Sequence, residues 1–277
     1  RDAMTNRRVC ILGAGNMGRA LIGGLLRAGT RPEQLSVGES LPAARELLAR
    51  ELGVSASGDN AAAIAGAEVV VLAVKPQDAA TTLAPLAAAL AAARPLVISV
   101  AAGVRIAVLE ASCGPGVPVI RAMPNRPALI GAGVSALYAP AAVGAAQRTI
   151  AERLLRAMGE IVWVSAEAEL DVVTALSGSG PAYFFLLAEL MAEAGEQLGL
   201  EGAVARRLAA ATLYGSGLLV HSGAADLARL RTEVASPGGT TEAALRTLEA
   251  ANLRATVRAA LAAATTRSRE LAAQGIP

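Results

Sequence analysis

Short runs of consecutive apolar residues alternate with helical stretches over roughly the first 165 positions of the chain. Runs without polar alternation are typical of strands buried on both faces of a parallel sheet, with helices above and below. The pattern predicts helices at Met17–Ala28 and Pro42–Glu51, and strands at Val9–Leu12, Leu35–Glu39, Val69–Val74, Leu96–Val100, Val117–Met123 and Ile161–Val164.

The strand pattern stops near Ala166, and the rest of the chain shows only helical pattern. Breaks are predicted where glycine and proline interrupt it, at Gly178–Pro181, Gly199, Gly223 and Ser236–Gly239. A chain of 277 residues is long enough for two domains with separate cores. We therefore predict an α/β domain over residues 1–165 and an all-helical domain over residues 166–277.

The composition narrows the classes of partner. Aromatic residues are 2% of the chain, too few for the stacking platforms of a single-strand nucleic-acid binder. The net charge of +2 comes without a long basic run, so no nucleic-acid partner is predicted. The apolar stretches Leu83–Ala93 and Tyr183–Ala188 are both too short to span a bilayer, so no membrane partner is predicted either.

The two cysteines, Cys10 and Cys113, lie far apart and fit no metal-binding spacing, so no metal site is expected. Arg1–Ala3 precede Met4 without the apolar stretch of a secretory signal. Together these features predict a cytoplasmic protein.

A glycine-rich turn directly follows the first predicted strand and opens the first helix, and it fits the pattern G-x-G-x-x-G. In that context the pattern predicts a dinucleotide site, because the turn brings backbone N–H groups and the helix N-terminus to a pyrophosphate. A plain strand–helix turn that needs glycines is the alternative. The residues are Gly13, Ala14, Gly15, Asn16, Met17 and Gly18.

Glu39 ends the second strand about 20 residues beyond the glycines, where a carboxylate accepts hydrogen bonds from the adenosine ribose of NAD. Ser40 beside it can donate to the 2′-phosphate of NADP, but no arginine follows immediately. The cofactor is therefore predicted as NADPH or NADH. Glu39→Ser is expected to favour NADPH by removing repulsion of the 2′-phosphate.

Five segments occur in an order and spacing that resemble the pyrroline-5-carboxylate reductase family: Ile11–Gly18, Leu72–Pro76, Arg121–Asn125, Leu176–Tyr183 and Ser236–Thr241. The resemblance covers nearly the whole chain. It implies a Rossmann dinucleotide-binding domain followed by a helical dimerisation domain. It also implies reduction of pyrroline-5-carboxylate to proline by NADPH or NADH, the last step of proline biosynthesis.

The resemblance also implies roles for residues position by position. Ser40 matches the position beside the adenosine 2′ carbon, and the departure at Gly223, where some members carry glutamate, leaves no role to transfer there. The remaining cofactor-side candidates are Asn60, Ala73, Val74, Lys75, Pro76 and Ala102. The candidates for substrate binding are Ser177, Gly178, Ser236, Gly238, Gly239, Thr240 and Thr241, with Thr241 and Lys75 as catalytic candidates.

The predicted chemistry needs little acid catalysis, because a protonated cyclic imine already accepts hydride. Ser236–Thr241 suits the substrate carboxylate, since glycines let N–H groups curl inward ahead of a helix. A simple helix cap is the alternative for this loop, and a strand-end side chain is the alternative for Lys75. Rival functions are a related imine reductase, a β-hydroxyacid dehydrogenase and a non-catalytic dinucleotide sensor.

The helix predicted at Pro181–Leu198 is apolar on nearly every side, so it must be buried. A helical domain of this size has little interior in which to hide it. We therefore predict a homodimer built from the helical domains, and the resemblance suggests further assembly to a decamer. A monomer that buries this face internally is the alternative.

Overall fold

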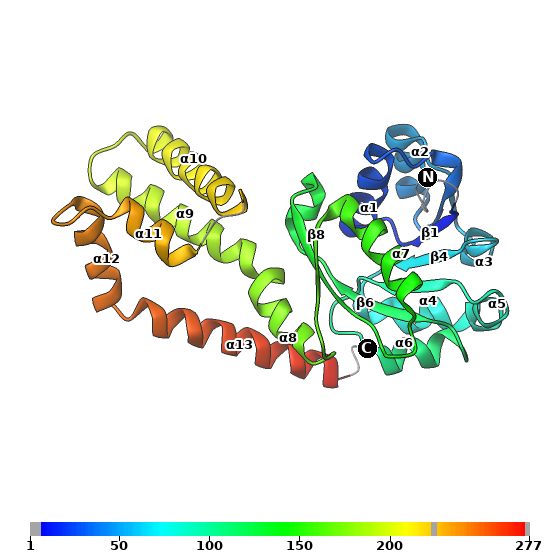
Figure 1. Cartoon of the computed structure of the whole chain (residues 1–277). Coiled ribbons are helices and arrows are strands. Elements are labelled where there is room, and N and C mark those ends of the chain that lie inside the picture. Colours follow the sequence, from blue (N-terminus) through cyan, green and yellow to red (C-terminus); the bar gives the residue numbers. More distant parts are fainter. Residues whose placement is uncertain (1–6, 223–225, 275–277) are drawn as a thin grey trace. The chain divides into compact units, whose positions relative to one another are not determined.

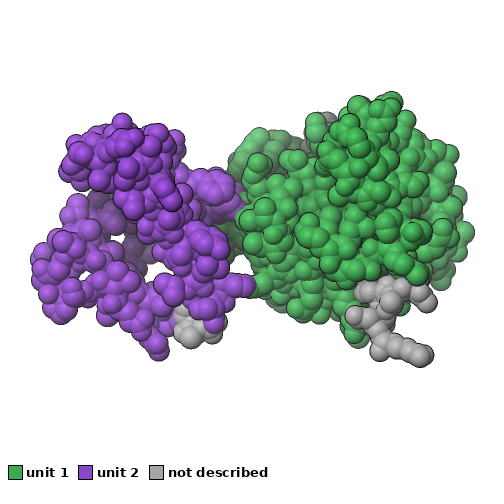
Figure 2. Space-filling view, turned by 90° about the horizontal axis from the view of Figure 1, so that it is seen from above, with its two compact units in different colours: residues 1–178, 264–277 green, residues 179–263 purple. Residues whose placement is uncertain are grey.

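The computed structural model describes residues 7–222 and 226–274, so the predictions at Arg1–Met4 and Gly223 lie outside the described residues. The chain forms two compact units (Figure 2): residues 1–178 with 264–277, and residues 179–263. The first unit therefore includes the start of the helical region and the last turns of the final helix.

One eight-stranded sheet organises the first unit, in the order β3-β2-β1-β4-β5-β6-β7-β8 (Figure 1). All neighbouring strands run parallel except β6 and β7, which are antiparallel. The strands are β1 Val9–Leu12, β2 Leu35–Gly38, β3 Ala56–Ser57, β4 Val69–Leu72, β5 Leu96–Ser99, β6 Val119–Met123, β7 Gly133–Tyr138 and β8 Gly159–Trp163.

Helices cover both faces of this sheet because successive strand residues point to opposite sides. On β1, Val9 and Ile11 join one core cluster, while Cys10 and Leu12 join the other. The first cluster is covered by α1 Asn16–Arg27, α2 Pro42–Leu52 and α7 Ala145–Leu155; the second by α3 Asn60–Ile64, α4 Ala79–Leu83, α5 Ala87–Ala93 and α6 Ile106–Cys113. The predicted α/β class is confirmed.

The described residues beyond Ala166 contain only helices, as predicted. They are α8 Glu169–Val173, a π-helical turn at Thr174–Gly178, α9 Gly180–Gln197, α10 Gly202–His221, α11 Leu227–Val234, α12 Thr240–Ala250 and α13 Leu253–Ala273. Breaks occur at Gly199 and at Ser236–Gly239 as expected, and a further one occurs at Asn252, whose φ is 58°.

The predicted break at Gly178–Pro181 is limited to Ser179, a bend that separates the π-helical turn from α9 and forms the N-cap of α9. On either side of this bend helical structure continues from Glu169 to Gln197, and Pro181 is accommodated in the first turn of α9, where its missing N–H costs nothing. This 29-residue run is long and apolar enough to cross a membrane by length and composition alone. From the sequence, only the short apolar stretch Tyr183–Ala188 was considered in this region, and the length of the helical run was therefore missed.

Buried polar groups fasten the helical segments of the first unit to its sheet. Arg121, on β6, pairs with Glu167, which also accepts the backbone N–H of Ile106. Asp171, on α8, accepts from Arg105 and from Ser268, on α13, both at 2.8 Å. Burial lowers the pKa of the Arg121 guanidinium, and its hydrogen bond to Glu167 opposes that shift. Removing one partner from such a network lowers stability, because it leaves a buried charge without its counter-charge.

Both cysteines are free and buried, so we expect them to be unreactive in the native protein. Burial raises the pKa of Cys10 to about 11 and that of Cys113 to about 12. The reactive thiolate is therefore scarce at pH 8. Because the unfolded chain ionises near the ordinary value of 9.0, stability should fall as the pH rises above it.

Ellman's reagent checks this expectation. At pH 8 the native protein should leave both thiols unmodified, and the urea-unfolded chain should titrate two. Rapid modification of either thiol in the native protein would contradict the burial described above.

Candidate functional site

The predicted glycine turn links β1 to α1 at the carboxyl edge of the sheet. Gly13 has φ +98°, a left-handed conformation, and its N–H donates to the Gly38 carbonyl at 2.8 Å. A β-carbon on Gly13 would lie 2.7 Å from the Ala73 carbonyl oxygen, and one on Gly18 would lie 2.1 Å from that of Gly13. Glycine is therefore required at both positions by the packing of strand, turn and helix.

Gly15 differs from these two because the space beside it is open. A β-carbon there would meet no protein atom within 4 Å, and its φ of −67° suits any residue. Gly15 is the N-cap of α1 and is exposed, so free N–H groups of the helix face this open space. The arrangement fits the pyrophosphate of a dinucleotide, which needs close approach of backbone N–H groups.

Glu39, just beyond the end of β2, holds the neighbouring backbone. Its carboxylate accepts the N–H of Ala14 and the N–H of Leu41, each at 2.9 Å. The side chain therefore ties the glycine turn to the turn between β2 and α2. Its contact with a cofactor ribose stays a prediction.

Ser40 and Asn60 also lie beside the end of β2. Ser40 is exposed, directly after Glu39. A β-carbon on Gly38 would lie 2.3 Å from Asn60 Oδ1, so the Asn60 side chain rests on the strand end. The sequence candidates for the adenosine end of the cofactor are thus neighbours in the structure.

Lys75 and Pro76 follow β4, which ends at Leu72, two residues before the predicted end at Val74. Lys75 is exposed and precedes a single turn of 3₁₀ helix at Pro76–Asp78. Ala102 follows β5, which is hydrogen-bonded beside β4. These residues therefore share the carboxyl edge with the glycine turn, where ligands bind in open α/β sheets.

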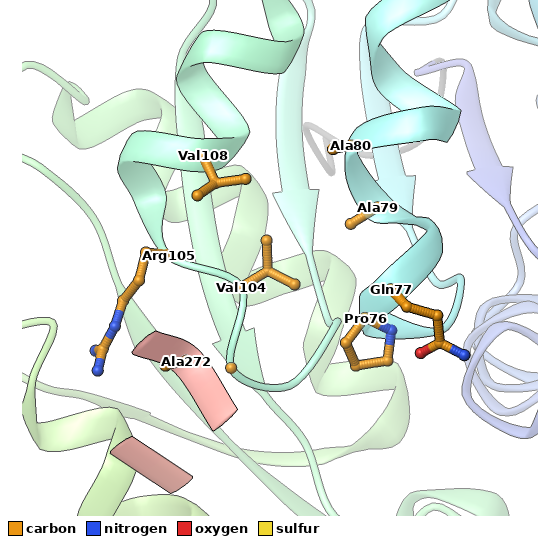
Figure 3. Close-up of a pocket in the computed structure, with 9 residues that line it drawn as sticks. Pro76, Gln77, Ala79, Ala80, Val104, Arg105, Val108 and Ala272 are labelled. Carbon is orange, nitrogen blue, oxygen red and sulfur yellow. The ribbon is translucent and has the colours of Figure 1, made fainter. Parts of the chain in front are cut away.

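A pocket of about 120 Å³ opens at this edge, between the turn after β4 and the loop after β5 (Figure 3). Pro76 and Gln77 lie on one side, and Val104 and Val108 on the other, with Ala272 of α13 completing the lining. It adjoins the candidates for the nicotinamide half of the cofactor.

Asn125, after β6, brings the π-helical turn to the same edge. Its Nδ2 donates to the Ser177 carbonyl at 3.1 Å, and its Oδ1 accepts the Val134 N–H at 2.9 Å. A β-carbon on Gly178 would lie 2.7 Å from the Met123 Cε atom, so the end of the Met123 side chain would have to move for a larger residue to fit there. Ser177 and Gly178 are thereby positioned from the β6 end, a role for Asn125 that the sequence pattern did not reveal.

The loop Ser236–Thr241 belongs to the second unit and precedes α12. Gly238 has φ +73°, and Gly239 is the N-cap, with its N–H donating to the Ser236 carbonyl at 3.0 Å. The Gly238 N–H donates to the carboxylate of Glu242 in the first turn of α12. Sequence reasoning missed Glu242, although a glutamate in the first helical turn is a known capping signal.

Thr241 lies in the first turn of α12, half-buried. In the part of the chain that the structure describes, its hydroxyl forms no hydrogen bond, so it is available to a ligand. The structure thus provides two groups of candidates, one along the sheet edge and one in the loop before α12.

Comparison with known protein families finds two matches in this chain. A family described as pyrroline-5-carboxylate reductase dimerisation matches residues 167–271, and one described as NADP oxidoreductase, coenzyme F420-dependent, matches residues 8–103. The pyrroline-5-carboxylate reductase of Pseudomonas aeruginosa is 46% identical over 271 residues, which cover 98% of this chain and 99% of that protein.

This chain belongs to the pyrroline-5-carboxylate reductase family. The reductase of Mycobacterium tuberculosis is 43% identical over 286 aligned positions, covering 95% of this chain and 96% of that protein. The solved reductase of Coxiella burnetii has a TM-score of 0.92 at 38% identity, covering 96% of this chain and 98% of that one. The reductase of Plasmodium falciparum, solved with NADP bound, has a TM-score of 0.84 at 28% identity, covering 98% of this chain and 100% of that one.

Proposed function

We propose that the protein reduces 1-pyrroline-5-carboxylate to L-proline, the last step of proline biosynthesis, with NADPH or NADH as hydride donor. The observation that carries the proposal is the match of nearly the whole chain to reductases of this name over nearly their whole length. The open space at Gly15 and the carboxylate-binding loop before α12 agree with it.

The cofactor is proposed to lie along the carboxyl edge of the sheet. Gly13–Gly18 would hold its pyrophosphate, Glu39, Ser40 and Asn60 its adenosine end, and Ala73–Pro76 with Ala102 its nicotinamide half. A reduced nicotinamide bound there supplies the hydride. The protein's part is to orient the two reactants and to exclude other reactions.

The substrate carboxylate is proposed to bind the loop Ser236–Thr241, and Ser177 and Gly178 are proposed separately as substrate-binding residues. The Gly238 N–H donates to a carboxylate oxygen of Glu242, and this contact supports the proposal that the loop backbone accommodates carboxylates. The iminium form of the substrate takes hydride at its ring carbon, and the nitrogen keeps its proton to become the amine of proline. Thr241 and Lys75 would position the imine without transferring that proton.

A substrate panel tests the proposal. Cofactor oxidation is followed with pyrroline-5-carboxylate and with a six-membered cyclic imine, and cofactor reduction with a β-hydroxyacid. We expect the five-membered imine to give by far the highest kcat/KM. A higher value with the six-membered imine would indicate a related imine reductase, oxidation of the hydroxyacid would indicate a dehydrogenase, and no turnover would indicate a dinucleotide sensor.

Replacing Thr241 by valine should preserve the fold and lower activity. The change removes a hydroxyl that is free to bind substrate and keeps the shape of the side chain. Loss of a hydrogen bond to a charged group costs about 1.5–3 kcal/mol, or roughly tenfold or more in kcat/KM.

Thr247→Val is the matched control, because Thr247 lies on the same helix with its hydroxyl bonded to the Ala243 carbonyl. Steady-state kinetics with pyrroline-5-carboxylate compares the two variants. Wild-type kcat/KM in Thr241→Val would remove Thr241 from the mechanism.

The assembly proposed is a homodimer through the helical region, which the dimerisation family covers. Phe184, Phe185 and Leu187 on α9 are more than half exposed in the single chain. A second copy that covered them would remove this apolar surface from water. Further assembly to a decamer and a cytoplasmic location, with both thiols free, complete the proposal.

A further inference from the structure

One arginine lies over the end of β2, although none follows Ser40 immediately in the sequence. Arg45 projects from the first turns of α2 back over the turn that precedes the helix. Its Nη1 donates to the carbonyl oxygens of Glu39 and Ser40, both at 2.8 Å. A β-carbon on Gly58 would lie 3.1 Å from Nη1, so the glycine at this position makes room for the guanidinium.

The guanidinium of Arg45 retains donors for a ligand. It carries five N–H groups, and both of these hydrogen bonds use Nη1 alone, which leaves Nη2 and Nε. Among the described residues Arg45 forms no ion pair. Its charge is therefore not neutralised by a carboxylate, and the side chain is only half-buried.

The carboxylate of Glu39, the residue before Ser40, already has hydrogen-bond partners. Both oxygens of Glu39 accept backbone N–H groups, from Ala14 and Leu41, which disperse its negative charge. An anion arriving beside Ser40 would thus meet an exposed hydroxyl and an unpaired guanidinium, with the carboxylate turned toward the glycine turn.

We propose that Arg45, together with the Ser40 hydroxyl, binds the 2′-phosphate of NADPH and sets a preference for NADPH over NADH. The carboxyl end of the second strand of such a fold meets the adenosine ribose, and a guanidinium binds phosphate through paired N–H groups. The inference rests on the proposed use of a nicotinamide dinucleotide. It assigns the choice between NADPH and NADH mainly to the charge of Arg45, with the Ser40 hydroxyl as a second donor.

The first test measures binding without the reaction. Calorimetric titration compares 2′,5′-ADP with 5′-AMP, which differs from it only in lacking the 2′-phosphate, on the wild-type protein, Arg45→Met and Arg50→Met. Arg50 is the control because it lies at the far end of α2, with a side chain 77% exposed. Wild type and Arg50→Met should bind 2′,5′-ADP about ten- to hundredfold more tightly than 5′-AMP, and Arg45→Met should bind the two with nearly equal affinity.

The second test measures the ratio of kcat/KM with NADPH to that with NADH. Arg45→Met should lower this ratio by about ten- to hundredfold through KM for NADPH, with the NADH values unchanged. Arg45→Lys should recover part of it, because the charge remains but the paired donors do not.

Three results would overturn the inference. The first is equal binding of 2′,5′-ADP and 5′-AMP by the wild type. The second is a preference for 2′,5′-ADP that survives undiminished in Arg45→Met. The third is an equal loss of activity with both dinucleotides, which would mean that Arg45 only supports the turn. Since the titration needs no imine, tight binding of 2′,5′-ADP with no reduction of pyrroline-5-carboxylate would count against the proposed reaction alone.

Discussion

Replacing Gly15 by alanine is expected to keep the protein folded and to weaken its binding of NADPH by about ten- to hundredfold, the cost of one lost charge-assisted hydrogen bond. The backbone of Gly15 suits alanine, and a β-carbon there would meet no protein atom within 4 Å. The methyl group would instead occupy the space through which the pyrophosphate reaches the N–H groups of α1. Thermal melts and calorimetric titration with NADPH measure the two effects separately.

Gly18→Ala is the contrasting variant. Its β-carbon would lie 2.1 Å from the Gly13 carbonyl oxygen, so the turn or α1 must move. Overpacking of this kind costs about 1–3 kcal/mol, and each kcal/mol lowers Tm by about 2–4 °C in a chain of this size. Gly18→Ala should therefore lose both stability and affinity. If Gly15→Ala bound NADPH as tightly as the wild type, the pyrophosphate could not lie beside Gly15.

Replacing Leu187 by arginine is expected to convert the assembled protein to single chains with little activity. Leu187 is half exposed on α9 in the single chain, and its neighbours Phe184 and Leu190 are comparably exposed. An arginine in the centre of a covered apolar face would bury an unpaired charge, which costs several kcal/mol. Light scattering and sedimentation at low concentration measure the mass.

Ala92→Arg is the control, because it adds the same charge at an exposed position of α5 in the sheet-containing unit. This variant should keep the wild-type mass. A wild-type protein with the mass of one 27.8 kDa chain would contradict the dimer. A requirement for detergent to keep the wild type in solution would instead indicate that a membrane covers the apolar run of α8 and α9.

Features that depend on local pattern were predictable from the sequence. The apolar runs located six of the strands to within a few residues, because buried parallel strands leave no polar alternation. The glycine turn was predictable because its spacing reflects a steric demand that the structure shows at Gly13 and Gly18. The loop before α12 was predictable as a helix start for the same local reason.

Features that depend on the packing of distant segments were not predictable from the sequence. Strand β7, Gly133–Tyr138, was missed because it mixes small residues with the buried polar Ser135, and its place beside β6 supplies the burial. The π-helical turn at Thr174–Gly178 has no sequence signature, so only the break that follows it, at Ser179, was predictable. Arg45 was missed because it lies five residues beyond Ser40 in the sequence. The first turn of α2 brings its side chain back to the Ser40 carbonyl.

Isotope transfer tests the proposed reaction most directly. The protein is incubated with pyrroline-5-carboxylate and with NADPH that carries deuterium at the transferable position of the nicotinamide ring. The product is then analysed by mass spectrometry and on a chiral column. We predict L-proline with one deuterium on the ring carbon that was doubly bonded to nitrogen, formed in equal amount to the NADPH consumed. Absence of proline, or proline without deuterium, would contradict hydride transfer to this imine.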